Sequence, residues 1–153
     1  MIARINQAVE WLLITVFGIM VLTVTWQVVS RFVLGDASSF SEELARFCLI
    51  WLTVLGAAYI VGQKGHIAVD YLYQKSSPQR QLVLMKLVYV CIALFALVVM
   101  IIGGGQLVYI TLHLGQTSSA LQLPLGYVYS IVPISGLLML FYTAHNWSKE
   151  GKA

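Results

Sequence analysis

Four apolar blocks, each long enough to cross a lipid bilayer, constrain this chain more than any other feature. A hydrocarbon core of about 30 Å requires about 20 consecutive, mostly apolar residues in a helix. Of the 153 residues, 59% are hydrophobic and only 10% are charged, whereas about a quarter of a soluble domain is charged. We therefore predict an all-α integral membrane protein, a single four-helix membrane domain over residues 1–153. The transmembrane helices are expected at residues 9–32, 41–62, 82–113 and 125–147.

The first block resembles a secretory signal peptide in one respect, since Arg4 precedes it. Its apolar stretch, residues 11–29, exceeds the roughly 7–15 residues of a signal-peptide core and ends without a small-residue cleavage pattern. We therefore expect it to remain as an uncleaved first transmembrane helix.

Positive residues are distributed unevenly between the two sides of this predicted topology. Lys and Arg accumulate in the cytoplasmic loops of membrane proteins. One side carries seven of the nine: Arg4, Lys64, Lys75, Arg80, Lys86, Lys149 and Lys152. The other carries Arg31 and Arg46, so both termini are expected in the cytoplasm and the loops at 34–40 and 114–124 outside. No basic patch is interleaved with stacking aromatics, so we expect no nucleic-acid binding.

The motif SSFSEELAR places charge directly before the second apolar block. Ser39 and Glu42 fit a Ser-x-x-Glu capping box, and Ser41 is the alternative cap. Glu42 and Glu43 suit the positive end of the helix dipole. Arg46 follows on the same face, so a capped helix end is one sufficient explanation. The other is a polar cluster, joined by Arg31, that ties the first two helices together or docks another subunit, because charges at membrane depth normally face protein or water.

The motif GHIAVDYL, at residues 65–72, lies between the second and third blocks. It is compatible with a short helix in the membrane interface, where Lys75 and Arg80 would meet anionic lipids. His66 and Asp70 are four residues apart and can pair if the segment is helical. We do not expect His66 to bind a metal or to act in catalysis.

Small residues interrupt two of the predicted helices. Gly103, Gly104 and Gly105 lie in the third, where we favour close approach of another backbone over a hinge. Ala58 and Gly62 form a small-xxx-small pair on the second, which also indicates close helix contact.

The histidines and acids restrict the function. Haem ligation by two histidines requires both at one depth of the membrane. His113 and His145 are expected near opposite membrane faces and do not fit this, but His66 and His145 share one side. A haem-binding membrane anchor of an oxidoreductase therefore remains the alternative. No Asp or Glu is expected mid-span, which argues against a self-sufficient exporter. We expect an accessory protein that is not an enzyme and holds no cofactor.

Four motifs occur in a recognisable order. They are VVSRFVLG at 28–35, SEELARFCLIWLTVLGAA at 41–58, GHIAVDYL at 65–72 and LQLPLGYVYSIVPISGLLML at 121–140. Together they resemble the small membrane subunit, of DctQ type, of tripartite ATP-independent periplasmic (TRAP) transporters.

This resemblance implies a role in the bacterial inner membrane. It implies a large polytopic partner with the substrate pathway, a soluble periplasmic binding protein, and sodium-coupled import of an organic acid such as a dicarboxylate or sialic acid. The small subunit would be a stationary scaffold, and its outer loops are placed to touch the binding protein. The matching residues, which we expect at subunit contacts, are Arg31, Glu42, Glu43, Arg46, Trp51, Gly56 and His66.

Overall fold

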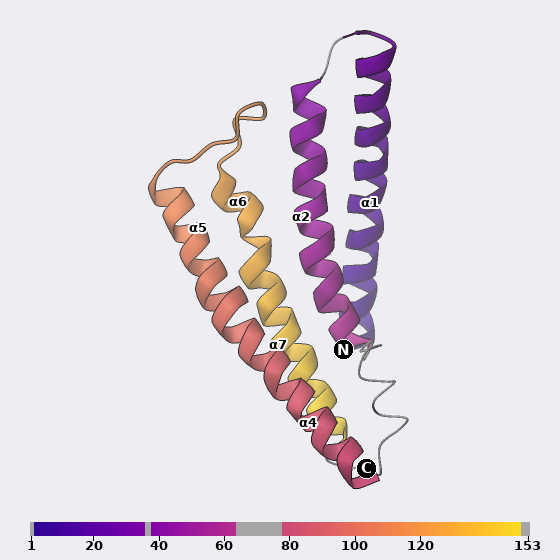
Figure 1. Cartoon of the computed structure of the whole chain (residues 1–153), viewed down its shortest axis with the longest axis vertical. Coiled ribbons are helices and arrows are strands. Elements are labelled where there is room, and N and C mark those ends of the chain that lie inside the picture. The colour runs from indigo at the N-terminus through magenta and orange to yellow at the C-terminus, as the bar shows by residue number, and fades with distance from the viewer. Residues whose placement is uncertain (1, 36–37, 64–77, 151–153) are drawn as a thin grey trace.

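The computed structural model describes residues 2–35, 38–63 and 78–150 (Figure 1). This part of the chain is helical and contains no strand beyond an isolated bridge between Thr117 and Pro124. Its elements are α1 (Ile2–Phe32), α2 (Ser39–Gly62), α4 (Pro78–Phe95), the π-helix η1 (Ala96–Gly103), α5 (Gly104–His113), α6 (Leu125–Tyr129) and α7 (Ile131–Glu150). Four spans are long and apolar enough to cross a membrane: Ile2–Phe32, Ser39–Gly62, Val83–His113 and Leu125–Ser148. The prediction of four transmembrane helices is confirmed.

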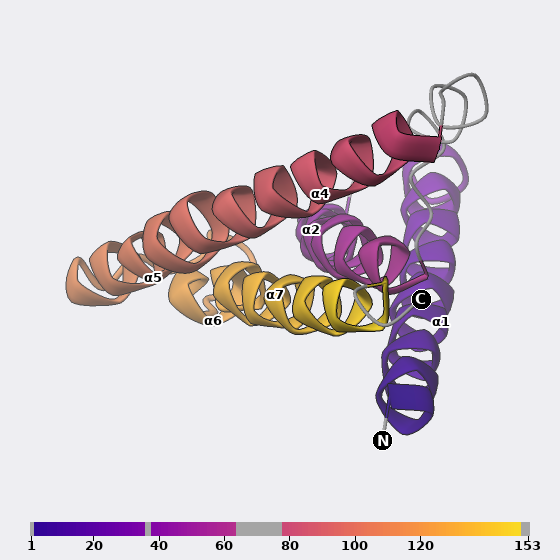
Figure 2. The same ribbon diagram turned by 90° about the horizontal axis from the view of Figure 1, so that it is seen from below.

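The helices alternate in direction, so the junctions α1–α2 and α5–α6 lie at the same end of the bundle (Figure 1). We call this the loop end, marked by Ser39 and Leu125. The start of α1 and the finish of α2 and α7 lie toward the opposite, terminal end, marked by Ile2 and Gly62. Seen from below, α2 stands between α1 and α7, while the rod formed by α4, η1 and α5 runs along α6 and α7 (Figure 2). The cytoplasmic placement of both termini stays a prediction.

Helix α1 meets the rest of the bundle along one narrow stripe. Half-buried or buried residues recur every three or four positions: Ile2, Asn6, Val9, Leu13, Val16, Met20, Thr23, Gln27 and Ser30. This spacing is typical of a seam between two helices, and the neighbour is α2. The helix begins at Ile2 rather than at residue 9, because hydropathy detects the apolar span and not the polar turn that precedes it.

The core lies where α7 packs against α2 and η1. Its buried cluster comprises Ala58, Val61, Ala96, Met100, Met139 and Tyr142. Ala58 is fully buried, and a Cβ atom at Gly62 would lie 3.0 Å from the ring of Tyr142. The small pair predicted on the second helix therefore serves packing within the chain.

The third span contains a π-helical segment that the sequence analysis missed. Residues Ala96–Gly103 have π-helical hydrogen bonding between α4 and α5. Gly136 of α7 lies against this segment, and a Cβ atom there would come within 2.8 Å of Met100 Cβ and 3.2 Å of the Ala96 carbonyl oxygen. Only a glycine on α7 permits this approach, since a larger side chain would push the two helices apart.

Glycine also permits close contact between α5 and the last span. A Cβ atom at Gly104 would lie 2.8 Å from Val132 Cγ1, whereas Gly103 and Gly105 face no comparable neighbour. Close contact with another helix is therefore found at Gly104 alone of the three glycines, and it is made by the side chains of Val132 and Pro133. Gly126 of α6 is pressed against the side chain of Leu112 in the same way.

The helix expected over residues 125–147 is present as one span, in which Ser130, with helical dihedrals of −57° and −23°, separates α6 from α7. Pro133 has no N–H group, so the carbonyl of Tyr129 receives no helical hydrogen bond from that position. Ser130 ends α6 with a backbone N–H that donates to the Gly126 carbonyl at 3.0 Å. Its hydroxyl donates to the Tyr127 carbonyl at 2.7 Å, which satisfies a second backbone group at this junction.

Candidate functional site

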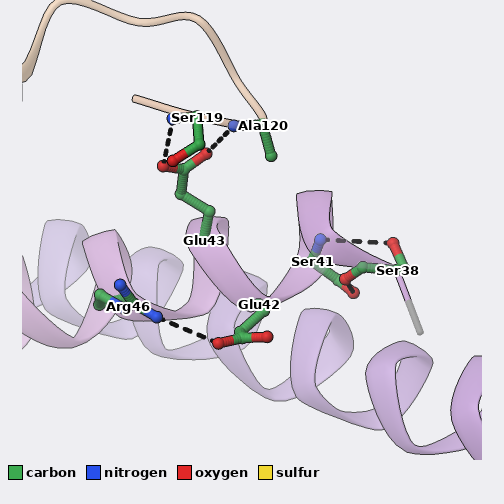
Figure 3. A network of polar contacts seen from close by, with 7 residues as sticks. All are labelled: Ser38, Ser41, Glu42, Glu43, Arg46, Ser119 and Ala120. Carbon is green, nitrogen blue, oxygen red and sulfur yellow. Dashed lines mark hydrogen bonds and ion pairs between the residues drawn. The ribbon is translucent and has the colours of Figure 1, made fainter. Parts of the chain in front are cut away.

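Helix α2 starts with a serine cap, one residue earlier than predicted. Ser38 is the capping residue, with extended backbone dihedrals of −72° and 99°. The Ser41 N–H donates to Ser38 Oγ at 3.4 Å, and the Ser41 hydroxyl donates to the Ser38 carbonyl at 2.9 Å (Figure 3). The predicted capping box between Ser39 and Glu42 is wrong, because Ser39 already belongs to the helix and the Glu42 side chain turns to Arg46.

Glu43 binds the loop that joins α5 to α6. Its Oε1 atom accepts a hydrogen bond from the Ser119 N–H at 3.1 Å. Its Oε2 atom accepts from the Ala120 and Leu121 N–H groups, both at 2.8 Å. Three consecutive N–H groups around one carboxylate form a backbone anion site, and the ionised acceptor strengthens each bond. Figure 3 shows the contacts with Ser119 and Ala120. Glu43 therefore fastens the start of α2 to a loop more than seventy residues away along the chain.

The loop is closed by its own hydrogen bonds, which turn these N–H groups toward Glu43. The Ser118 N–H donates to the Leu123 carbonyl at 2.9 Å, and the Leu123 N–H donates to Ser118 Oγ at 3.3 Å. The Leu125 N–H donates to the Gln116 carbonyl at 2.9 Å. Gln122 has a positive φ of 53°, a left-handed conformation uncommon outside glycine that completes the turn.

Glu42 and Arg46 form a separate, outward-facing pair. Arg46 Nη2 donates to Glu42 Oε1 at 3.1 Å, and the two side chains are 65% and 60% exposed. An exposed pair with this spacing stabilises a helix by about 0.3–0.5 kcal/mol. Among the side chains that the structure describes this is the only ion pair. Arg31 does not join it and lies at the end of α1, with its guanidinium 6.0 Å from the centre of the Phe32 ring.

The other predicted residues of α2 fall on different sides of the helix. Trp51 points inward, and its indole Nε1 donates to the Val128 carbonyl of α6 at 3.1 Å. Gly56 points away from the bundle, since nothing lies within 4 Å of a Cβ atom built there. The outer face of α2 consists of Glu42, Arg46, Leu49, Thr53, Gly56, Ala57 and Ile60. His66 and the predicted interfacial helix at 65–72 lie outside the described residues.

Two buried hydrogen bonds at the terminal end were missed by the sequence analysis. The Tyr142 hydroxyl donates to Asn6 Oδ1 at 2.6 Å, and Asn146 Nδ2 donates to the Val61 carbonyl at 3.2 Å. Tyr142 and Asn146 are 1% and 4% exposed. Tyr142 and Asn146 are four residues apart on α7, and this spacing indicates that they share one face of the helix. The spacing does not indicate their partners on α1 and α2.

The two histidines that the structure describes, His113 and His145, do not come together. His113 ends α5 at the loop end and stacks on Tyr109, with ring centres 5.7 Å apart. His145 lies near the finish of α7, toward the terminal end. Bis-histidine haem ligation needs two imidazoles at one depth, so the haem-anchor alternative gains no support from this pair. In the described part of the chain, no group of three or more His, Cys, Asp or Glu side chains is placed to hold a metal ion.

Comparison with known proteins gives consistent matches. The family model described as "Tripartite ATP-independent periplasmic transporters, DctQ component" matches residues 20–150. A protein of Haemophilus influenzae that is named among TRAP transporter small permeases is 29% identical over 135 residues, 88% of this chain and 82% of its own length. The sialic acid TRAP transporter small permease protein SiaQ of Vibrio cholerae is 26% identical over 141 residues, 90% of this chain and 78% of its length.

A third relative is built differently. The isethionate TRAP transporter permease protein DctMQ of Oleidesulfovibrio alaskensis is 32% identical over 103 residues. The match covers 67% of this chain but only 16% of that protein. A segment similar to this chain is therefore contained in a much longer permease polypeptide.

Proposed function

Because this chain belongs to the DctQ family of TRAP transporter components, we propose that it is the stationary scaffold of its transporter. It is a small permease subunit of the bacterial inner membrane and not an enzyme. In the proposed assembly a large polytopic subunit carries the substrate pathway and moves, while this subunit holds it in the bilayer. A soluble periplasmic protein delivers the substrate, and a sodium gradient drives import.

The large partner is supported by the match to the isethionate permease protein. In that relative the similar segment takes up only a small part of a long permease chain. Joining two segments in one polypeptide keeps them at high effective concentration and so favours contact between them. We infer that this chain reaches the same arrangement by non-covalent association.

The proposed substrate is an organic acid, such as a dicarboxylate, sialic acid or a related compound. Relatives are named for sialic acid and for isethionate, and both compounds are anions at neutral pH. Within the described spans Glu42 and Glu43 lie in the first turns of α2, and Glu10 lies about two turns inside α1, so the central turns hold no acid. A sodium or substrate site normally needs polar groups near mid-span, so the residues that choose the substrate are proposed to lie on the partner chains.

The observation that carries the docking role is the outer face of α2. Its Glu42–Arg46 pair faces no other element of the described chain, although both residues belong to a membrane-spanning helix. Further along the same face, Gly56 leaves space for another helix to approach closely. We propose that Glu42, Arg46 and Gly56 contact the large subunit, while Glu43 and Trp51 fix the orientation of α2 from inside the bundle.

Arg31 and His66 remain candidates for the same interface. Arg31 is exposed at the loop end and belongs to the set of residues implied by the family resemblance. Its charge lies on α1, next to the helix that carries the proposed docking face. His66 is proposed only on its match to the family motif.

Charge reversal at Arg46 tests the docking role. Arg46→Glu should reduce co-purification of the large subunit and lower uptake, without changing which substrate is preferred. The double variant Glu42→Arg, Arg46→Glu restores an ion pair but inverts its direction, so it separates the need for a pair from the need for a positive charge at position 46. Arg80→Glu, at an exposed arginine on α4, is the matched control. Normal assembly and transport by Arg46→Glu would leave only helix-end stabilisation for this pair.

A further inference from the structure

Helix α5 presents a polar stripe on the side opposite to its packing face. Gly104, Val108 and Thr111 face the bundle and are buried or half-buried. Gln106, Tyr109 and His113 recur every three or four residues on the opposite side and are all exposed, Tyr109 by 66%. This outer face of α5 thus combines an amide, a phenol and an imidazole on a helix that spans the membrane.

The amide of Gln106 has no hydrogen-bond partner among the described residues. It lies seven residues before His113, which places it about 10 Å inward along the helix from the loop end. A hydroxyl group on the same helix can satisfy itself, as Thr111 does by donating to the Leu107 carbonyl at 2.8 Å. A glutamine side chain has two donors and two acceptor sites, and lipid tails can satisfy none of them.

We propose that this face of α5 docks a membrane-spanning helix of the large permease subunit, one that carries a hydrogen-bonding side chain at the depth of Gln106. This inference rests on the proposed function. Polar side chains that hydrogen-bond across helices are a recurrent means of association in bilayers. Gly103 lies beside Gln106 on the exposed side and meets only the Val98 carbonyl of its own helix, so the partner backbone can come close enough for the amide to reach it.

The exposed side of α1 carries a different set of side chains, which are compatible with contact to lipid. Leu22 is 73% exposed and Trp26 54% exposed, and both are compatible with acyl chains. The hydroxyls of Thr15 and Thr25 donate to backbone carbonyls one turn earlier, each at 2.8 Å, so they need no external partner. The outer face of α5 differs because it carries the glutamine amide of Gln106, with two donors and two acceptor sites, about 10 Å inward from the loop end.

Site-specific photo-cross-linking tests the identity of the partner. A photoreactive phenylalanine analogue would be introduced at Tyr109, and at Leu22 as the control, in the small subunit co-expressed with the large one. We expect a cross-link to the large subunit from position 109 and not from position 22. A cross-link from 109 to a second copy of this chain, or to no protein while the large subunit still co-purifies, would overturn this inference and leave the proposed function standing.

Substitution of Gln106 tests the hydrogen bond itself. Gln106→Leu keeps the approximate size and should weaken association by about 3- to 20-fold, the range of measured interhelical hydrogen bonds in membranes. Gln7→Leu makes the same change on an exposed turn of α1 and should leave association unchanged. Both are measured as dissociation constants in lipid nanodiscs. Equal affinities for wild type and Gln106→Leu would refute the inference, whereas a wild-type subunit that does not bind the large subunit would refute the proposed function as well.

Discussion

The two ends of the bundle are held together by different chemistry. At the loop end, the ionised side chain of Glu43 binds three backbone N–H groups of an otherwise exposed loop. At the terminal end the contacts are made by neutral side chains. The nearly completely buried Tyr142 donates to the half-buried Asn6, and the buried Asn146 donates to the Val61 carbonyl. An ion that keeps some contact with water loses little solvation, whereas a fully buried ion would lose several kcal/mol. The comparison shows charge used at the surface and neutral hydrogen bonds in the interior.

The ends also differ in what they connect. The terminal end ties α1, α2 and α7 together, so it joins the beginning, middle and finish of the chain. Away from this end α1 packs on α2 alone, and only 6% of its most apolar stretch is buried, against 39% in the last span. Stability within the chain is therefore concentrated around α7, and the exposed helices are left for lipid and for partners.

The largest effect is expected from Tyr142→Ala at the terminal end. The change creates a cavity beside Gly62 and removes the hydrogen bond to Asn6. Loss of a buried aromatic side chain costs about 3–5 kcal/mol of unfolding free energy. Tyr142→Phe, which removes only the hydroxyl, should cost about 1 kcal/mol. Denaturation in mixed micelles measures both, and equal losses would mean that the hydrogen bond, not the ring, stabilises this end.

The next effect is expected from Gly126→Val at the loop end. The added side chain would overlap Leu112, which packs directly against Gly126. Overpacking of this kind costs about 1–3 kcal/mol of unfolding free energy. Gly18→Val is the matched control, because a Cβ atom there meets nothing within 4 Å. If Leu112→Ala does not rescue Gly126→Val in the same denaturation measurement, steric overlap is the wrong explanation.

A more local effect is expected from Glu43→Gln. In either orientation the neutral amide places its NH₂ group opposite at least one of the three loop N–H groups, so the loop should detach from α2 without unfolding the bundle. Hydrogen exchange at residues 119–121 should accelerate, while amides in α7 keep their protection. Glu42→Gln, one residue away and outside this contact, should leave the loop unchanged. Faster exchange throughout α7 would show that Glu43 stabilises the whole fold.

The smallest effect on stability is expected from Arg46→Gln. Its pair with Glu42 is exposed, so the loss should be at most about 0.5 kcal/mol and should disappear in high salt. The measurement is the unfolding free energy of the isolated subunit at two salt concentrations. A loss above about 1 kcal/mol would mean that the pair belongs to the fold and weakens the argument that it serves assembly.

The transmembrane spans were predictable because hydropathy is a property of short windows. Ala58 and Gly62 were predicted to pack closely, and the structure confirms the contact with Tyr142 for Gly62. The prediction of a single charged cluster was only partly right, because it placed Glu43 in the same group as Glu42 and Arg46. Adjacent residues on a helix point about 100° apart, so Glu42 and Glu43 were bound to reach different neighbours. The sequence did not reveal that the neighbour of Glu43 is a loop backbone.

The sequence by itself determined that this is a membrane protein of four helices and which family it resembles, because both follow from composition and residue order. Tertiary structure alone decided which polar groups are used inside the chain and which face outward. Glu43 meets N–H groups of Ser119 to Leu121, and Gly136 meets the π-helical segment, through pairings distant in sequence. Backbone N–H groups are the same in every residue except proline. Their availability to a carboxylate depends on the path of the chain in space, which local patterns do not contain.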